Sequence, residues 1–140
     1  MSSKTIPNKD ALSIIEESIA QGSPVKLTVK GNSMSPLLID GKDTVILEPC
    51  YHDSLEVGDI IFFRYRGSFL LHRIVVIDKD NGTITTKGDA LNQREIILIH
   101  DVIALAKVTE INYFRLLIRR LGIRLACLRG GLVKALLRKS

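Results

Sequence analysis

Residues 25 to about 110 alternate between short apolar runs and turn-forming residues. The runs are VKLTVK, TVILEP, DIIFFRY, SFLLHRIVVID, GTITTKG and DVIALAKVTEI. They are rich in β-branched residues and are separated by Gly, Pro, Asp or Asn, which is typical of strands in an antiparallel sheet. Arg66-Gly67 and the stretch DKDNG at 78–82 are predicted hairpin connections, because Asn-Gly and similar pairs adopt the positive φ angles of tight turns. The pattern predicts a mainly β domain of six strands.

A helical pattern precedes this region. Asp10 is placed to cap a short helix, which Gly22 and Pro24 end. The apolar residues predicted to share one side of this helix are Leu12, Ile14, Ile15 and Ile19.

The chain therefore divides into three parts. Residues 1–24 form the helix and lead-in, 25–110 the β-domain, and 111–140 a helical tail. The N-terminus has no apolar run of signal-peptide quality and nothing near the ~20 residues that span a bilayer. We expect a location in the cytoplasm or at the cytoplasmic face of the membrane.

Charge is distributed unevenly along the 140 residues. Residues 111–140 carry eight Lys or Arg and no acid, a charge of +8. The preceding 110 residues carry 12 basic and 15 acidic groups, a charge of −3. A Leu-rich helix with this charge is typical of binding to an anionic lipid surface.

A second interpretation of the tail is a helix that packs on the body with its arginines outward. We favour the lipid surface, and four arginines within about 20 residues argue against a spanning helix. Nucleic acid is not an expected partner, because aromatic residues for base stacking are scarce.

Cysteine and histidine are few and widely spaced. Cys50 and Cys127 lie far apart, and the three histidines show no close pairing. We therefore expect neither a disulfide framework nor a metal site, and no cofactor.

Ser33 lies in the stretch KGNSMSPLL, on a glycine-flanked bend after the first predicted strand. The simplest interpretation is a capping serine, since its oxygen accepts free backbone N–H groups. Likewise His72, in LLHRIVV, shares the face of Leu70, Ile74 and Val76 by strict alternation, which is compatible with a plain core histidine.

The alternative is nucleophilic catalysis. A serine hydroxyl needs a base to remove its proton, and a carboxylate holds that base in the useful tautomer. Asp89, in TTKGDALNQRE, would complete the trio with Ser33 and His72. Such trios also occur by chance in a chain of this length.

Whole motifs favour catalysis. GNSMSPLL resembles the Gly-x-Ser-Met-x-Pro box of type I signal peptidases and the related self-cleaving repressors. EVGDIIFFRYRGSFLLHRIVVI resembles their Val-Gly-Asp-Ile strand and base-carrying hairpin, with His72-Arg73-Ile74 similar to the His-Arg-Ile/Val of the endoplasmic-reticulum and archaeal-like branch. TTKGDALNQRE resembles that branch's Lys-Gly-Asp box, and DVIALAKV its closing strand. The resemblance covers about residues 25–108, in the family's order.

The resemblance implies a small signal-peptidase-like antiparallel β-domain with a catalytic site. Ser33 would be the nucleophile, His72 the general base and Asp89 its orienting acid. The Ser33 N–H would serve the oxyanion, with Asn32 a possible further donor. Met34 would line the substrate pocket, and Glu95 falls on the family's second acidic position.

We therefore expect a serine endopeptidase with a Ser33/His72 dyad that cleaves a specific peptide or protein precursor. The substrate would lie in an extended groove as an added strand. Two alternatives are a catalytically inactive peptide-binding module of the same fold and a self-cleaving protein.

Overall fold

The computed structural model describes residues 9–108 and 110–121. It divides the chain into two compact units, residues 1–107 and 108–140. The first unit contains one helix, seven strands and two short 3₁₀ helices. Their bounds are α1 (Lys9–Ala20), β1 (Val25–Thr28), β2 (Thr44–Glu48), η1 (His52–Ser54), β3 (Ile60–Tyr65), β4 (Ser68–Asp78), β5 (Thr83–Lys87), β6 (Arg94–Leu98), η2 (Ile99–Asp101) and β7 (Val102–Lys107).

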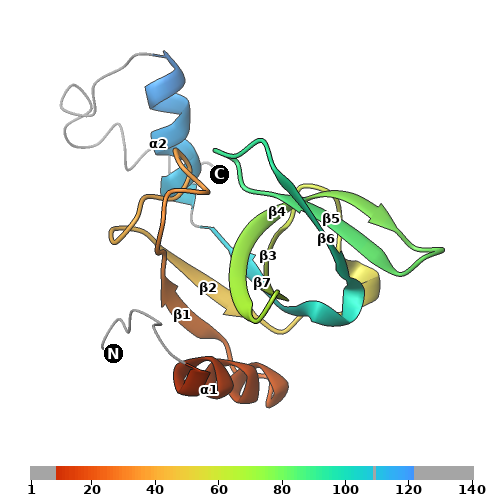
Figure 1. Cartoon of the computed structure of the whole chain (residues 1–140). Coiled ribbons are helices and arrows are strands. Elements are labelled where there is room, and N and C mark those ends of the chain that lie inside the picture. The colour runs from red at the N-terminus through yellow and green to blue at the C-terminus, as the bar shows by residue number, and fades with distance from the viewer. Residues whose placement is uncertain (1–8, 109, 122–140) are drawn as a thin grey trace. The chain divides into compact units, whose positions relative to one another are not determined.

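The seven strands form one curled sheet in the order β1-β2-β7-β3-β4-β5-β6, and every neighbouring pair is antiparallel (Figure 1). The predicted mainly β fold with a short N-terminal helix is confirmed, and all six expected strands are present. The seventh strand, β6, lies at one edge of the sheet and was not predicted. β7, the last strand in the chain, lies between β2 and β3.

The two predicted hairpin connections are confirmed. Tyr65 pairs with Ser68 across the β3–β4 turn, where Arg66 (φ 48°) and Gly67 (φ 73°) both take positive φ angles. This is the geometry of a two-residue turn whose twist matches that of the strands. The second hairpin, between β4 and β5, has Gly82 at φ 63°.

β4 does not alternate strictly along its length. Its register with β5 shifts between Ile74 and Val76, so one extra residue bulges from the ladder. Before the bulge, His72 and Ile74 are buried; after it, Ile77 packs against the core while Val76 is 45% exposed. The prediction that Val76 shares the face of His72 is therefore wrong, because a bulge reverses the facing of every residue beyond it.

A hydrophobic core lies inside the curl of the sheet. Its buried members come from five strands and from the segment around η1, and they are Leu55, Ile61, Phe63, Ile74, Ile84, Ile97 and Val102. Leu70 and Ile77 of β4 pack against this cluster. The core thus fixes β4, the strand that carries His72.

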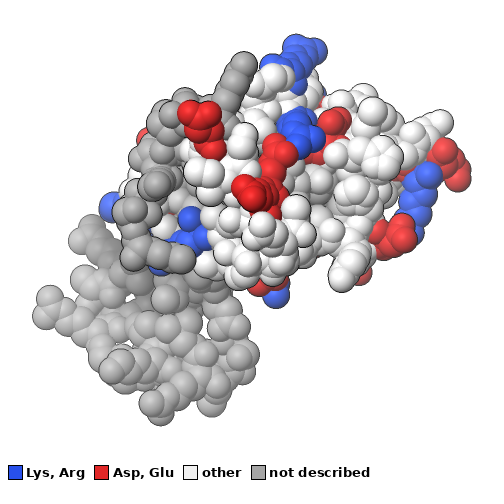
Figure 2. Space-filling view, turned by 90° about the horizontal axis from the view of Figure 1, so that it is seen from below, with Lys and Arg blue, Asp and Glu red and all other residues white. Residues whose placement is uncertain are grey.

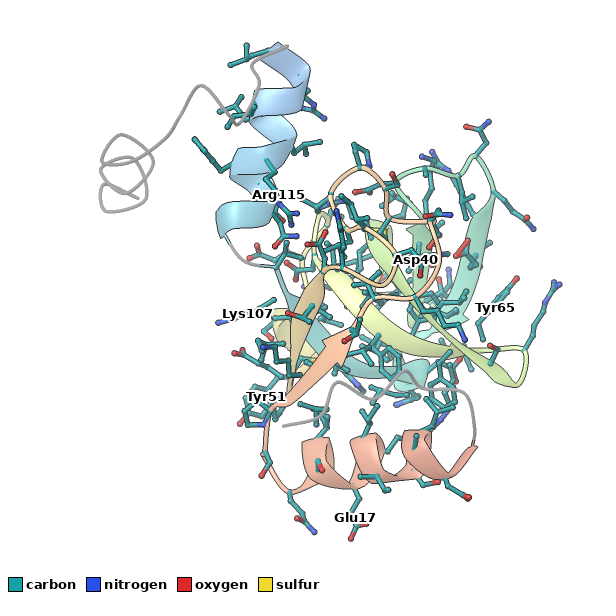
Figure 3. All side chains as sticks on the ribbon, turned by 90° about the vertical axis from the view of Figure 1, so that its left-hand side faces the viewer. Glu17, Asp40, Tyr51, Tyr65, Lys107 and Arg115 are labelled. Atoms are coloured by element: carbon teal, nitrogen blue, oxygen red, sulfur yellow. The ribbon has the colours of Figure 1, made fainter. Side chains whose placement is uncertain are left out.

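α1 lies beneath β1 and contacts both β1 and β7 (Figure 1). Ile15 and Ile19 are buried, whereas Ile14 is 61% exposed and lies off the apolar face. Glu17 points away from the strands (Figure 3). Arg64 of β3 donates its Nε–H to Glu16 at 3.1 Å, which ties the helix to the sheet.

The ends of α1 differ in part from the sequence prediction. The helix begins at Lys9, so Asp10 lies in its first turn and not at the N-cap. At the other end, Gly22 takes φ 83° and donates to the carbonyl of Ile19. Glycine suits this position because it adopts the left-handed conformation without a Cβ penalty.

Charged side chains of both signs lie on one face of the first unit. On the face that Figure 2 shows from below, Lys and Arg are interspersed with Asp and Glu and do not gather into one basic patch.

The second unit contains the helix α2 (Glu110–Leu121). The rest of the predicted basic tail, including Gly130-Gly131, lies outside the described residues. Among the helices described, none combines the length and the apolar character that crossing a membrane requires.

Candidate active site

Ser33 lies on the loop that connects β1 to β2, in a series of tight turns. Gly31 enters the loop at φ 87°, and its N–H donates to Asp40 Oδ1 at 2.8 Å. Figure 3 labels Asp40 in this loop. Leu38 N–H donates to the carbonyl of Met34 at 2.9 Å, which closes the next turn. The loop is thus held by its own hydrogen bonds.

The capping interpretation of Ser33 finds no support. Within the described residues, no hydrogen bond engages its hydroxyl or its amide N–H. Ser33 is half-buried and lines a cavity, whereas the following Met34 is fully buried. Both polar groups of Ser33 are thus available to a ligand.

The loop after β5 is fastened to the serine loop. Ala90 N–H donates to the backbone carbonyl of Ser33 at 2.9 Å, and Asp89 N–H approaches Met34 Sδ at 3.5 Å. Met34 therefore has a positioning contact in addition to lining the cavity. Asn32 is exposed and accepts a backbone hydrogen bond from Ser35 at 3.1 Å.

Gly88 lies close to both the serine loop and His72. A Cβ on this residue would lie 2.7 Å from the carbonyl oxygen of Ser33 and 3.1 Å from Nε2 of His72. Both groups therefore approach one point beside Gly88, which makes Ser33 and His72 neighbours. No hydrogen bond joins the Ser33 hydroxyl to His72 within the described residues.

His72 is held from its other ring nitrogen. Its Nδ1 contacts Oε1 of Glu95, which reaches it from β6. Only 3% of His72 and 5% of Glu95 are exposed, so water is largely excluded from the pair. Thr86, fully buried on the intervening strand, has its Oγ1 3.5 Å from the same carboxylate oxygen. The Phe63 ring meets the imidazole edge to face at a centroid distance of 6.1 Å.

The sheet register explains this arrangement. Thr86 of β5 is paired with Glu95 of β6 and, on its other side, with Ile74 of β4. Ile74 is two residues from His72, so all four side chains lie on one face. An imidazole so placed has Nδ1 towards the carboxylate and Nε2 towards the serine loop.

Asp89 does not occupy the expected place. Its carboxylate accepts two hydrogen bonds of 2.9 Å from the guanidinium of Arg73, which also donates to the carbonyl of Gly58 at 2.8 Å. Successive residues of a strand point to opposite faces, so Arg73 draws Asp89 to the face away from His72. The prediction that Asp89 holds His72 is corrected, since Glu95 makes that contact.

A cavity of about 550 Å³ opens beside Ser33. It is lined by residues of α1, β1, the serine loop, β3 and the start of β4, among them Leu12, Leu27, Val29, Lys30, Met34, Phe62, Ser68, Phe69 and Leu71. Most of these side chains are apolar. Pockets of this volume and lining commonly bind ligands.

Within the described residues, the site contains neither a metal-binding cluster nor the Cys50 thiol. In the described part of the chain, no group of three His, Cys, Asp or Glu could hold a metal ion. The pKa of the Cys50 thiol is raised by burial and then by the negative charge of Asp59. Cys50 packs against the core cluster and does not line the cavity.

A β-sheet that brings a serine, a histidine and a buried carboxylate together is the type of site found in serine peptidases. The sequence model of the Peptidase S24-like family matches residues 2–109. The chain therefore belongs to the Peptidase S24-like family, a group within the signal-peptidase-like superfamily that comprises serine peptidases and self-cleaving proteins. A search of curated proteins found no match.

Sequence reasoning missed two residues of the site. Thr86 and Gly88 both belong to TTKGDALNQRE, which was singled out only for Asp89. The available signals are a threonine in a β-branched run and a glycine immediately before a loop. Their roles depend on cross-strand pairing, which the sequence does not state.

Proposed function

We propose that the protein is a serine endopeptidase of the Ser-His branch that cleaves a specific peptide or protein precursor. The observation that carries the proposal is the buried contact of His72 with Glu95, together with the approach of His72 Nε2 and the backbone carbonyl oxygen of Ser33 to one point beside Gly88. Burying the carboxylate of Glu95 costs free energy unless the charge has a partner. A histidine that served only as core packing would not require a carboxylate beside it.

In the proposed reaction, Ser33 Oγ attacks the scissile carbonyl carbon and its proton passes to Nε2 of His72. The carboxylate of Glu95 accepts the Nδ1–H and stabilises the imidazolium that forms. His72 then gives the proton to the leaving amine, and the peptide C–N bond breaks. Water attacks the resulting ester by the same route and regenerates the Ser33 hydroxyl.

The negative charge that develops on the carbonyl oxygen needs donors. The amide N–H of Ser33 has no partner among the described residues, so it is free to donate. Gly31, two residues earlier, has no hydroxyl to offer. Asn32 is exposed beside the nucleophile and is the proposed second donor.

Asp89 has a supporting place in this proposal. Its ion pair with Arg73 and its N–H contact with Met34 fasten the Gly88 loop to both β4 and the serine loop. It acts through position and not through a contact with the base.

We also propose that residues 111–140 hold the enzyme on an anionic membrane surface. The support is the charge of +8 beside a body of −3, and the helix that begins this segment. Each cation near such a surface contributes about 1 kcal/mol.

The peptidase is tested by incubating the wild-type chain with a proteome-derived peptide library and detecting new termini by mass spectrometry. We expect cleavage that Ser33→Ala and His72→Ala both abolish while each variant keeps its melting temperature. Absence of cleavage by wild type, or cleavage that persists in Ser33→Ala, would favour a non-catalytic peptide-binding module.

A further inference from the structure

The cavity beside Ser33 lies between two strands that are not paired with each other. Leu27 of β1 and Val29, which follows this strand, contribute to one wall, and β4 contributes Phe69 and Leu71 to the other. Phe62 of β3 completes the apolar lining, with its ring stacked on that of Phe69 at a centroid distance of 5.5 Å.

Both walls have unpaired backbone edges. Among the described strands, β1 pairs only with β2 and so ends the sheet. β4 pairs with β3 from Ser68 onward, but its pairing with β5 begins only at Arg73. Residues 68–72 therefore have no strand on their second side. Unpaired N–H and C=O groups at strand edges are templates for an added strand.

The size and lining of the cavity define the side chains that fit. An added strand directs every second side chain towards the same face. Methyl groups at those positions would leave most of a 550 Å³ cavity unfilled, and the lining aromatic and aliphatic groups would lose contacts. Bulky aliphatic or aromatic groups would fill it and gain the free energy of apolar burial.

The lining includes one charged side chain, that of Lys30, which is exposed. It lies three residues before Ser33 in the chain. A carboxylate on the bound segment near Lys30 would be complementary to the lysine charge, whereas a cation there would be repelled.

We propose that the segment bound beside Ser33 is an extended peptide with bulky apolar side chains at alternate positions and an acidic residue near Lys30. That the bound peptide is also cleaved rests on the proposed peptidase function. That it binds is tested first and independently. It assigns a substrate class to the cavity: apolar, extended and acidic at one end.

The probes are three fluorescent ten-residue peptides. The first has Leu at alternate positions and one Asp; the second has Ala in place of each Leu; the third has Lys in place of Asp. Binding to full-length Ser33→Ala is measured by fluorescence polarisation. We expect the first peptide to bind at least tenfold more tightly than either of the others. Equal or tighter binding of the Ala peptide, or no binding of any peptide, would overturn the proposal.

Two matched pairs of variants locate the effect. Lys30→Glu should reverse the preference for Asp over Lys, while Lys26→Glu, exposed on β1 and outside the lining, should not. Ser68→Trp should occupy part of the cavity and reduce the preference for Leu, while Ser23→Trp should not. If neither Lys30→Glu nor Ser68→Trp changes the peptide preferences, the peptides bind outside this cavity.

Cleavage separates this proposal from the proposed function. Selective binding of the Leu peptide without cleavage by wild type would support the substrate class and reject the peptidase. Preferential cleavage of the Ala peptide by wild type would support the peptidase and reject the substrate class.

Discussion

Glu95 on β6 contacts the Nδ1 of His72 on β4 across the full width of β5. The contact joins two residues that are 23 positions apart in the sequence and both buried. In the proposed mechanism the imidazole carries its proton on Nδ1, beside the Glu95 carboxylate, which leaves Nε2 free to accept another.

Glu95→Gln is expected to lower kcat strongly. An amide in place of the carboxylate can present N–H to Nδ1 and favour the wrong tautomer, an effect of about 10⁴-fold in the type case of such triads. The measurement is cleavage of a peptide identified in the library assay, with thermal unfolding recorded in parallel. Glu48→Gln, whose carboxylate pairs with Lys107 at the surface, is the control. Full activity of Glu95→Gln would remove Glu95 from the mechanism.

Asp89→Asn is expected to have a smaller effect than Glu95→Gln. It weakens the ion pair with Arg73, which is a quarter exposed and therefore contributes about 1 kcal/mol or less to stability. We expect a loss of activity of less than about tenfold, the equivalent of 1.4 kcal/mol. The same kinetic assay decides the matter, since a loss as large as that of Glu95→Gln would return Asp89 to the catalytic group.

Gly88→Ala is expected to reduce activity sharply. The new Cβ would lie 2.7 Å from the carbonyl oxygen of Ser33, so the serine loop or the Gly88 loop has to move. Gly82→Ala is the matched control, because its Cβ meets nothing within 4 Å but its φ of 63° is strained for alanine by about 1 to 2 kcal/mol. Kinetics and urea unfolding of both variants should show that each loses stability and only Gly88→Ala loses activity. Equal activities would contradict the close approach.

Because of the bulge in β4, we expect charged substitutions at the adjacent residues Val76 and Ile77 to have different effects on stability. Ile77→Lys should destabilise the fold by about 2 to 4 kcal/mol, because it places a charge against the core cluster. Val76→Lys should change the free energy of unfolding by less than about 0.5 kcal/mol, because Val76 lies at the surface. Urea denaturation measures both, and the reverse order would mean that the strand alternates without a bulge.

Cys50 is expected to react slowly with iodoacetamide at neutral pH. Burial and the charge of Asp59 raise the pKa of its thiol, so the thiolate fraction is smaller than in an ordinary cysteine. Asp59→Asn removes the charge and leaves the burial, and should therefore increase the rate. Both rates are measured by mass spectrometry in a Cys127→Ser background, with urea-unfolded protein as the reference. A rate unaffected by Asp59→Asn would show that burial alone controls the thiol.

The proposed membrane contact predicts salt-sensitive binding to anionic vesicles. Four of the eight cations at about 1 kcal/mol each would give roughly 4 kcal/mol, which corresponds to millimolar affinity before any leucine is buried. Co-sedimentation should retain the full chain at low ionic strength and release it at high ionic strength, because salt screens the surface potential. A chain ending at residue 110 should remain in solution. Equal pelleting of the two chains would reject the role of the tail.

The strands could be predicted because they alternate around one core, but two features of the sheet could not. β6 contains only one short apolar run, and its Ile96 is 71% exposed, so it resembles a loop with a hydrophobic patch. The bulge at β4 leaves no mark in SFLLHRIVVID, where both faces are apolar. In each case tertiary pairing, and not local preference, determines the facing.

The proposed nucleophile and base, Ser33 and His72, can be singled out from the motifs around them, whereas the contact of His72 with Glu95 cannot. The choice between Asp89 and Glu95 depends on which face of β4 each can reach, and the adjacent Arg73 decides it by binding Asp89 on the opposite face. The strand register, and not the residue type, therefore determines which of the two carboxylates contacts His72.

The position of β7 has a consequence for the chain as it is synthesised. β1 and β2 carry the serine loop between them, while His72 and Glu95 belong to β3–β6, and β7 is the strand that joins these two groups within the sheet. Synthesis proceeds from the N-terminus, and a domain generally folds as one unit. Until residues 102–107 are released, Ser33 and His72 belong to groups of strands that β7 has not yet joined. In the proposed peptidase, the newborn chain therefore becomes competent for cleavage only when the last strand of the β-domain is in place.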